Sequence, residues 1–268
     1  MQYIITILIA LFAIYLYTIR GRRGNAMMAQ LREWKFAHRG LHDDKLPENS
    51  MGAFRAALEN GYGIELDVHL LADGNLAVIH DSALKRTTGA EGIVEDLTTE
   101  DLTKYHLEGT EETIPTFREL LDLYEGKAPL IVELKPVKGN HAALTARAVE
   151  MLDNWNGLYC LESFDPRCIY WLKKNRPDIC RGQLSGNYFE LKEKMALWLR
   201  VVLTWHMENF LCLPDFIAYR FCDRKNFGTT LVRKLWHIPG VSWTLKTPEE
   251  YAAATKEGWI PIFENFKP

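Results

Sequence analysis

Residues 62–68 read YGIELDV and residues 129–135 read PLIVELK, two short runs rich in apolar and β-branched residues with charged residues near their ends. Such runs favour buried strands of a parallel sheet. The same kind of run recurs along the chain, so these two belong to a larger set. The other predicted strands lie at 35–38, 158–164, 180–184, 215–219, 241–245 and 259–263.

Helical patterns separate these strands. Several of them begin with residues that favour a helix start, such as Ser50, Thr116, Asp165 followed by Pro166, and Thr247. Eight buried strands alternating with helices predict an α/β fold, specifically a closed (β/α)₈ TIM barrel. The predicted helices lie at 50–59, 116–124, 141–154, 166–175, 189–212, 226–236 and 248–256.

A ninth apolar run, residues 75–80, lies outside this count. It begins only about eight residues after Asp67, too few for the dozen or more of a parallel crossover. The turn-forming residues ADGN precede it, so we expect a hairpin on the barrel rim that carries His80. No helix follows the last strand, and we expect residues 26–34 to cover that gap.

The amino-terminal segment differs from the rest of the chain. Residues 1–19 carry no charge and are followed by Arg20, Arg22 and Arg23. About 20 apolar residues cross a bilayer as a helix, and basic residues on the far flank favour an uncleaved anchor over a cleaved signal peptide. The sequence predicts a transmembrane anchor at 1–20, a linker or short helix at 21–33 and the barrel at 34–268. It also predicts single-pass insertion in the cell membrane, with the catalytic domain in the cytoplasm.

The composition argues against nucleic acid as a partner. A net charge of −3, a pI near 6.3 and the lack of a basic stripe argue against nucleic-acid binding. The five cysteines show no metal-ligand spacing and form an odd set. We therefore expect free thiols in a reducing compartment.

Charged residues gather where the predicted strands end, the edge at which TIM barrels place their active sites. Alternate strand residues point to one face, so Glu65 and Asp67 share a face, as do Glu133 and Lys135. Taken singly, each of these charged residues could have its place at a strand end because it forms a simple salt bridge. Together, three buried carboxylates are costly unless they bind something, and oxygen ligands suit a hard cation, Mg²⁺ or Ca²⁺.

The order of motifs resembles the glycerophosphodiester phosphodiesterase family, over roughly residues 36–245, and we expect a membrane-anchored bacterial-type member. The resemblance implies a TIM barrel that hydrolyses glycerophosphodiesters to glycerol 3-phosphate and an alcohol, with a divalent cation and two histidines. The matching motifs are His38-Arg-Gly, Pro47-Glu-Asn-Ser50, Glu65-Leu-Asp67, Asp73-Gly74, His80-Asp81, Arg86-Thr-Thr88, Ile114-Pro-Thr116, Glu133-Leu-Lys135, SFDP (163–166), GQL (182–184) and WTL (243–245).

The resemblance also implies a role for each matching residue. His38 and His80 correspond to the acid/base pair, Arg39 and Lys135 to the phosphate-binding residues, and Glu65, Asp67 and Glu133 to the metal ligands. Two departures, Lys246 after WTL and residues 263–266 in place of a Thr-Asp-Arg-Pro-like ending, concern substrate recognition more than chemistry. His42 lies near enough to the site to be left open; the other histidines are interpreted as structural.

Residues 186–214 are long for a connection between a strand and the next helix. Their apolar face favours either a helix packed on the barrel or an interfacial helix that dips into a lipid bilayer and admits lipid substrates. The interfacial helix would favour an alternative function, lysophospholipase D or phospholipase-C-like activity on membrane lipids, including lysophospholipids. A second alternative is a catalytically silent phospholipid- or phosphate-binding barrel. The apolar residues are Leu191, Met195, Trp198, Leu199, Val202, Leu203 and Trp205.

Overall fold

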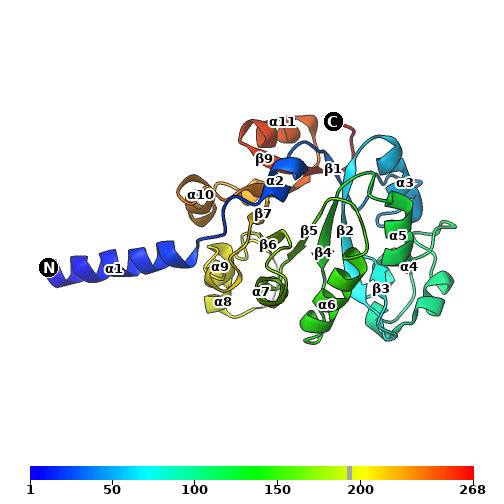
Figure 1. Ribbon diagram of the computed structural model, residues 1–268, viewed down its shortest axis with the longest axis horizontal. Coiled ribbons are helices and arrows are strands. Elements are labelled where there is room, and N and C mark those ends of the chain that lie inside the picture. The colour runs from blue at the N-terminus through cyan, green and yellow to red at the C-terminus, as the bar shows by residue number, and fades with distance from the viewer. Residues whose placement is uncertain (192–194) are drawn as a thin grey trace.

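The computed structural model describes residues 1–191 and 195–268. Eight parallel strands close on themselves, because β1 pairs with β2 on one side and with β9 on the other. The predicted TIM barrel is confirmed (Figure 1). Its strands are β1 (Phe36–His38), β2 (Gly63–Leu70), β4 (Leu130–Leu134), β5 (Tyr159–Ser163), β6 (Arg181–Ser185), β7 (Phe216–Arg220), β8 (Gly240–Leu245) and β9 (Trp259–Phe263).

The predicted rim hairpin is also confirmed. Strand β3 (Leu76–Val78) pairs antiparallel with the end of β2. Gly74 lies in the connecting turn with a φ of +83°, a conformation that glycine adopts without a steric penalty. The hairpin therefore extends β2 beyond the barrel and brings His80 back to its mouth.

Helices follow the strands as the sequence predicts, and their starts coincide with the predicted capping residues. The side chains of Ser50, Thr116, Asp165 and Thr247 each accept a hydrogen bond from the first turn of a helix. The helices are α3 (Met51–Glu59), α5 (Phe117–Tyr124), α6 (His141–Leu152), α7 (Pro166–Asn175), α10 (Phe227–Lys234) and α11 (Pro248–Lys256), with the short α4 (Lys85–Thr88), η1 (Val94–Asp96), η2 (Thr99–Lys104) and η3 (Phe221–Asp223).

The single helix predicted at 189–212 is not observed. Its described residues contain two shorter helices, α8 (Leu197–Thr204) and α9 (Asn209–Cys212), while residues 192–194 of the predicted helix lie outside the described part of the chain. On α8, Leu203 is buried whereas Trp198 is 67% exposed. The interfacial role for residues 186–214 stays a prediction.

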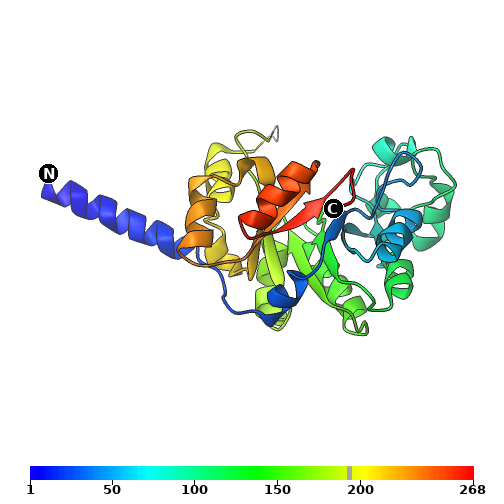
Figure 2. The same ribbon diagram turned by 90° about the horizontal axis from the view of Figure 1, so that it is seen from above.

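The predicted membrane anchor is wrong. Helix α1 (Gln2–Thr18) has 17 residues and projects away from the barrel (Figures 1 and 2). At about 1.5 Å per residue it rises about 25 Å, less than the roughly 30 Å of a bilayer's hydrocarbon core. Within the described ranges, no helix combines the length and apolar character needed to cross a membrane. This finding overturns the predicted single-pass localisation with a cytoplasmic catalytic domain.

The end of α1 is attached to the barrel. The indole N–H of Trp236 donates a hydrogen bond to the carbonyl of Leu16 at 3.0 Å, and the Asn209 amide donates one to the carbonyl of Ile19 at 3.1 Å. Arg22 then pairs with the fully buried carboxylate of Asp215, with a nitrogen–oxygen distance of 2.5 Å. The first residues after α1 are therefore part of the folded domain.

Helix α2 (Ala26–Leu31) closes the amino end of the barrel. Met28 and Leu31 are buried in one apolar cluster with Ile131 and Cys160. These two strand residues precede Glu133 and Glu162 by two positions, so they point into the barrel below them. The expectation that residues 26–34 cover the gap after the last strand is wrong: α2 plugs the bottom of the barrel, because its apolar face fits the inward-facing residues there.

Candidate active site

The strand register brings the predicted residues together at the carboxyl end of the barrel. His38 of β1 is the register partner of Glu65 of β2, and Asp67 of β2 is the partner of Glu133 of β4. In parallel strands, register partners point to the same face, so these side chains converge inside the mouth. Arg39 follows β1 directly.

Glu65, Asp67 and Glu133 form a carboxylate cluster. One oxygen from each lies within 4.8 Å of the others, and all three side chains are buried. Burial, followed by the neighbouring charges of Asp67 and Glu133, raises the pKa of Glu65 well above its ordinary value. Burial likewise raises the pKa of Glu133 to about 7. The cluster is therefore electrostatically strained and favours a cation.

Two basic side chains partly neutralise the cluster. The Lys135 ammonium lies 2.8 Å from Glu133 and 3.1 Å from Asp67, and the Arg39 Nε lies 3.3 Å from Asp67. Although burial alone would raise the pKa of Asp67, these two cations hold it well below its usual range. The amide of Asn49 also donates a hydrogen bond to Asp67 at 2.9 Å.

His38 lies between two carboxylates. Its Nε2 is 3.8 Å from Glu65, and its Nδ1 is 3.3 Å from Glu264, which follows β9. Burial lowers the pKa of His38 despite the raising effect of Glu264. The same contact holds the pKa of Glu264 at about 2. The imidazole is therefore neutral near pH 7 and presents one nitrogen to the carboxylate cluster.

His80 is held by an ionic chain on the opposite side. Its Nδ1 lies 2.6 Å from Asp81, whose carboxylate also contacts Arg86. Arg86 donates in turn to Glu48 at 2.6 Å, and Glu48 accepts a hydrogen bond from Arg39 at 2.9 Å. Burial, with the charges of Lys135 and Arg39, lowers the pKa of His80 to about 4. This imidazole is also neutral near pH 7.

These groups surround a small inner cavity of about 50 Å³ that His38, Arg39, Glu65, His80 and Glu133 line together with Glu162 and Trp243. A neighbouring cavity of about 510 Å³ is lined by His80, Lys135, Phe164 and Trp243. The inner cavity is wide enough for an ion or a water molecule, and the neighbouring one is the size of a small ligand. All seven predicted site residues thus meet at one place.

Sequence reasoning missed four residues of this site. Glu48 and Asn49 lie in the loop before α3, in the motif that ends with the helix-capping residue Ser50. Glu48 also contacts Arg39, and Asn49 contacts Asp67. In the sequence, Glu264 stands out only as part of a departure from a motif. Glu162 is the register partner of Glu133, is 1% exposed and has one oxygen without a hydrogen-bond partner among the described residues. The sequence does contain a signal for Glu162, because it is an acidic residue in the middle of a predicted buried strand.

The chain matches known proteins over most of its length. Residues 38–228 match the sequence model of the glycerophosphoryl diester phosphodiesterase family. The chain is 43% identical over 107 residues to a glycerophosphodiester phosphodiesterase of Bacillus altitudinis, covering 37% of this chain and 43% of that protein. It is 30% identical over 246 residues to glycerophosphodiester phosphodiesterase 1 of Rattus norvegicus, covering 80% of this chain and 72% of that one. The match thus spans less than half of the bacterial relative.

Solved structures share the fold. A phosphodiesterase of Oleispira antarctica, solved in complex with the product sn-glycerol-3-phosphate, superposes with a TM-score of 0.69 at 22% identity and covers 86% of this chain and 92% of that one. At this identity the likeness concerns the fold alone. It agrees with the barrel described above.

Proposed function

Since this chain belongs to the glycerophosphoryl diester phosphodiesterase family, we propose that it hydrolyses glycerophosphodiesters to glycerol 3-phosphate and an alcohol. The observation that carries the proposal is the convergence of two neutral histidines, two basic side chains and three carboxylates at the barrel mouth, around two neighbouring cavities. Each group suits one demand of phosphodiester hydrolysis: binding the anion, moving two protons and stabilising the developing charge.

We propose that Glu65, Asp67 and Glu133 hold one divalent cation, Mg²⁺ or Ca²⁺. Three carboxylate oxygens within 4.8 Å of one another fit a hard cation. Burial, together with the neighbouring carboxylates, raises the pKa values of Glu65 and Glu133, and a bound cation would relieve this repulsion. When bound, the cation supplies Lewis-acid polarisation of a phosphate oxygen and of the attacking hydroxyl. Three protein ligands leave positions open for both.

Arg39 and Lys135 would bind the phosphodiester. Both lie beside the carboxylates, and Arg39 presents a planar guanidinium that suits phosphate oxygens. Both side chains stay protonated near neutral pH, because the surrounding carboxylates raise the pKa of each above its ordinary value despite burial. The substrate would therefore meet two fixed cations.

His38 and His80 would carry the protons. Both are neutral near pH 7, so either can remove the nucleophile's proton. The other would first take up a proton from solvent, which the bound phosphodiester anion favours by raising the pKa of the imidazole, and would then donate it to the leaving alkoxide. Glu264 lies on the Nδ1 side of His38 and would accept a hydrogen bond from a proton on Nδ1, which leaves the lone pair of Nε2 directed at the reaction. Water and the substrate's own glycerol 2-hydroxyl both satisfy the role of nucleophile.

A substrate panel tests this function. The purified protein, supplied with Mg²⁺ or Ca²⁺, would be incubated with glycerophosphocholine, glycerophosphoethanolamine, lysophosphatidylcholine and phosphatidylinositol, and the products identified by mass spectrometry. We expect glycerol 3-phosphate from the glycerophosphodiesters. Release of lysophosphatidic acid alone would favour lysophospholipase D activity, and no turnover of any substrate would favour a silent binding barrel.

A further inference from the structure

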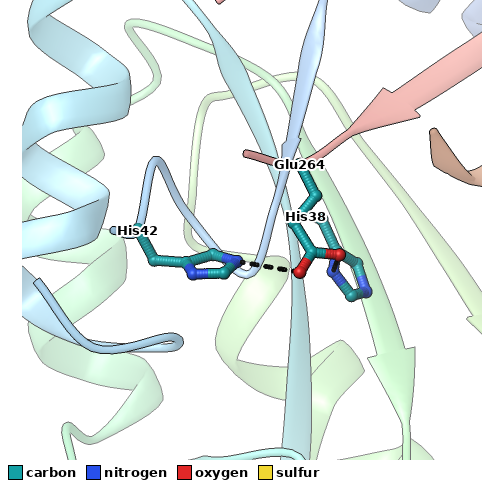
Figure 3. Close-up of side chains that lie close together, drawn as sticks. All are labelled: His38, His42 and Glu264. Atoms are coloured by element: carbon teal, nitrogen blue, oxygen red, sulfur yellow. Dashed lines mark ion pairs between the residues drawn. The ribbon is translucent and has the colours of Figure 1, made fainter. Parts of the chain in front are cut away.

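A second group of metal-binding side chains lies beside the carboxylate cluster. His38 at the end of β1, His42 in the following loop and Glu264 after β9 bring one donor atom each within 4.8 Å of the others. In Figure 3 the two imidazoles approach the same carboxylate from different sides. The Nδ1 of His38 lies 3.3 Å from one oxygen of Glu264, and the Nε2 of His42 lies 3.7 Å from the other.

The two ring nitrogens lack other partners. Both are shielded from solvent, and neither forms a hydrogen bond of good geometry with any described residue. A buried polar atom in this state is costly and points to a missing partner. Ligands at about 2.0–2.1 Å around a tetrahedral ion lie roughly 3.3–3.5 Å apart. The separation of His38 Nδ1 from Glu264 is in this range, the nitrogen of His42 is 3.7 Å from the other carboxylate oxygen, and the three donor atoms lie within 4.8 Å of one another. The side chains are thus arranged to receive an ion with small adjustments.

The donor set selects a different metal from that of the carboxylate cluster. Two imidazole nitrogens and one carboxylate oxygen suit Zn²⁺, whereas three carboxylates suit Mg²⁺ or Ca²⁺. We propose that His38, His42 and Glu264 form a Zn²⁺ site, separate from the carboxylate cluster, whose occupation inhibits the enzyme. Three protein ligands leave a fourth position for water.

One residue of this site borders an outer cavity. His42 also lines an outer cavity of about 630 Å³ together with Leu41, Asp43 and Asn265. The ammonium of Lys246 would compete with a metal ion for Glu264, since it lies 3.5 Å from that carboxylate. Its side chain is 58% exposed, however, and can turn into solvent. The carboxylate of Glu264 is 14% exposed and presents one oxygen to each imidazole.

The inhibitory effect, unlike the site itself, rests on the proposed function. A Zn²⁺ ion bound to Nδ1 of His38 uses that nitrogen's lone pair, so the ring's remaining proton must lie on Nε2. Nε2 is the nitrogen directed at Glu65 and the carboxylate cluster. With a proton on it and the metal on Nδ1, His38 can neither accept a proton from a nucleophile nor become the imidazolium that protonates a leaving group. The site would therefore stop proton transfer without displacing substrate from the barrel.

Metal binding is tested first, independently of turnover. The full chain, saturated with Mg²⁺, would be titrated with Co²⁺ as a spectroscopic substitute for Zn²⁺, following visible d–d absorption, and Zn²⁺ would then be added to displace it. We expect one Co²⁺ per chain, and at least a tenfold loss of affinity in His42→Ala and His42→Asn. His106→Ala, an exposed histidine elsewhere, serves as the control and should bind as wild type does.

Inhibition is tested second, with glycerophosphocholine as substrate and Mg²⁺ in excess. We expect Zn²⁺ to inhibit the wild type and His106→Ala, whereas His42→Ala should keep its basal rate and require at least tenfold more Zn²⁺. Equal Co²⁺ affinity in wild type and both His42 variants would overturn the site. Equal Zn²⁺ inhibition with a lost Co²⁺ signal would overturn the inhibitory role. An inactive enzyme that still binds Co²⁺ through His42 would refute the proposed function and leave the site standing.

Discussion

Glu133 is the register partner of Asp67 on the adjacent strand, and one ammonium, that of Lys135, lies within 3.1 Å of both carboxylates. Glu65, two residues before Asp67, adds a third negative charge, while Arg39 adds a second positive one. The cluster thus sets three carboxyl groups against two basic side chains, and Glu162 and Glu264 add further carboxyl groups beside it. This gathering of carboxyl groups, buried among parallel strands, is the physical basis for expecting a cation there.

The histidines should be essential for rate. Replacing His38 or His80 with alanine removes a proton-transfer group, so we expect turnover to fall by about 10²–10⁴-fold with the fold retained. Steady-state kinetics on a glycerophosphodiester and circular dichroism would measure both properties. His106→Ala, at an exposed position, is the control. A near-normal rate in either variant would remove that histidine from the mechanism.

The carboxylate cluster should determine metal affinity. Asp67→Asn keeps the shape of the side chain but loses its charge, so Mg²⁺ affinity and turnover should fall together, each by about tenfold or more. Isothermal titration calorimetry and kinetics would follow the two quantities. Asp122→Asn, on the exposed face of α5, should behave as wild type. If Asp67→Asn responds to the metal as wild type does, Asp67 is not a ligand.

Metal stabilisation should increase with pH. Folding raises the pKa of Glu133 from about 4.5 to about 7, so the metal-free fold is most stable when this group is protonated and loses stability as the pH rises toward 7. Mg²⁺ binds the deprotonated group. We therefore expect a larger rise of Tm with Mg²⁺ at about pH 8 than at about pH 5, measured by scanning calorimetry. An equal rise at both pH values would contradict the electrostatic description of the cluster.

The barrel and its seven central residues could be predicted because their signals are local. Buried strands appear as short apolar runs, and the alternation of Glu65 with Asp67 places both on one face without knowledge of the fold. The capping residues Ser50 and Thr116 fix helix starts in the same local way. The register of the parallel strands then aligns their carboxyl ends and brings these residues together.

The missed features depend on contacts between distant segments. Glu264 meets His38 only because β9 closes the barrel beside β1, which no local pattern records. The uncharged residues 1–19 have the composition of a membrane anchor. Their helix ends at Thr18, however, and Ile19 is buried against the domain. Composition predicted the apolar character of this segment and could not predict the length of its helix.

The segment after α1 should contribute to stability. Arg22 forms two hydrogen bonds with the buried carboxylate of Asp215, so Arg22→Ala leaves a buried charge without its partner. We expect a loss of about 2 kcal/mol in the free energy of unfolding, measured by urea denaturation. Arg118→Ala, which removes an exposed surface pair, should cost no more than about 0.5 kcal/mol. Equal effects in the two variants would show that residues 21–25 act only as a linker.

The central claim is that the carboxylate cluster and the two histidines hydrolyse glycerophosphodiesters with a divalent cation. The most direct measurement is the formation of glycerol 3-phosphate from glycerophosphocholine by the purified chain, before and after chelation and again after Mg²⁺ or Ca²⁺ is restored. We predict steady release of glycerol 3-phosphate and choline, its loss on chelation, and its recovery with the added ion. Full activity in the presence of chelator, or choline phosphate and glycerol as the products, would contradict the account.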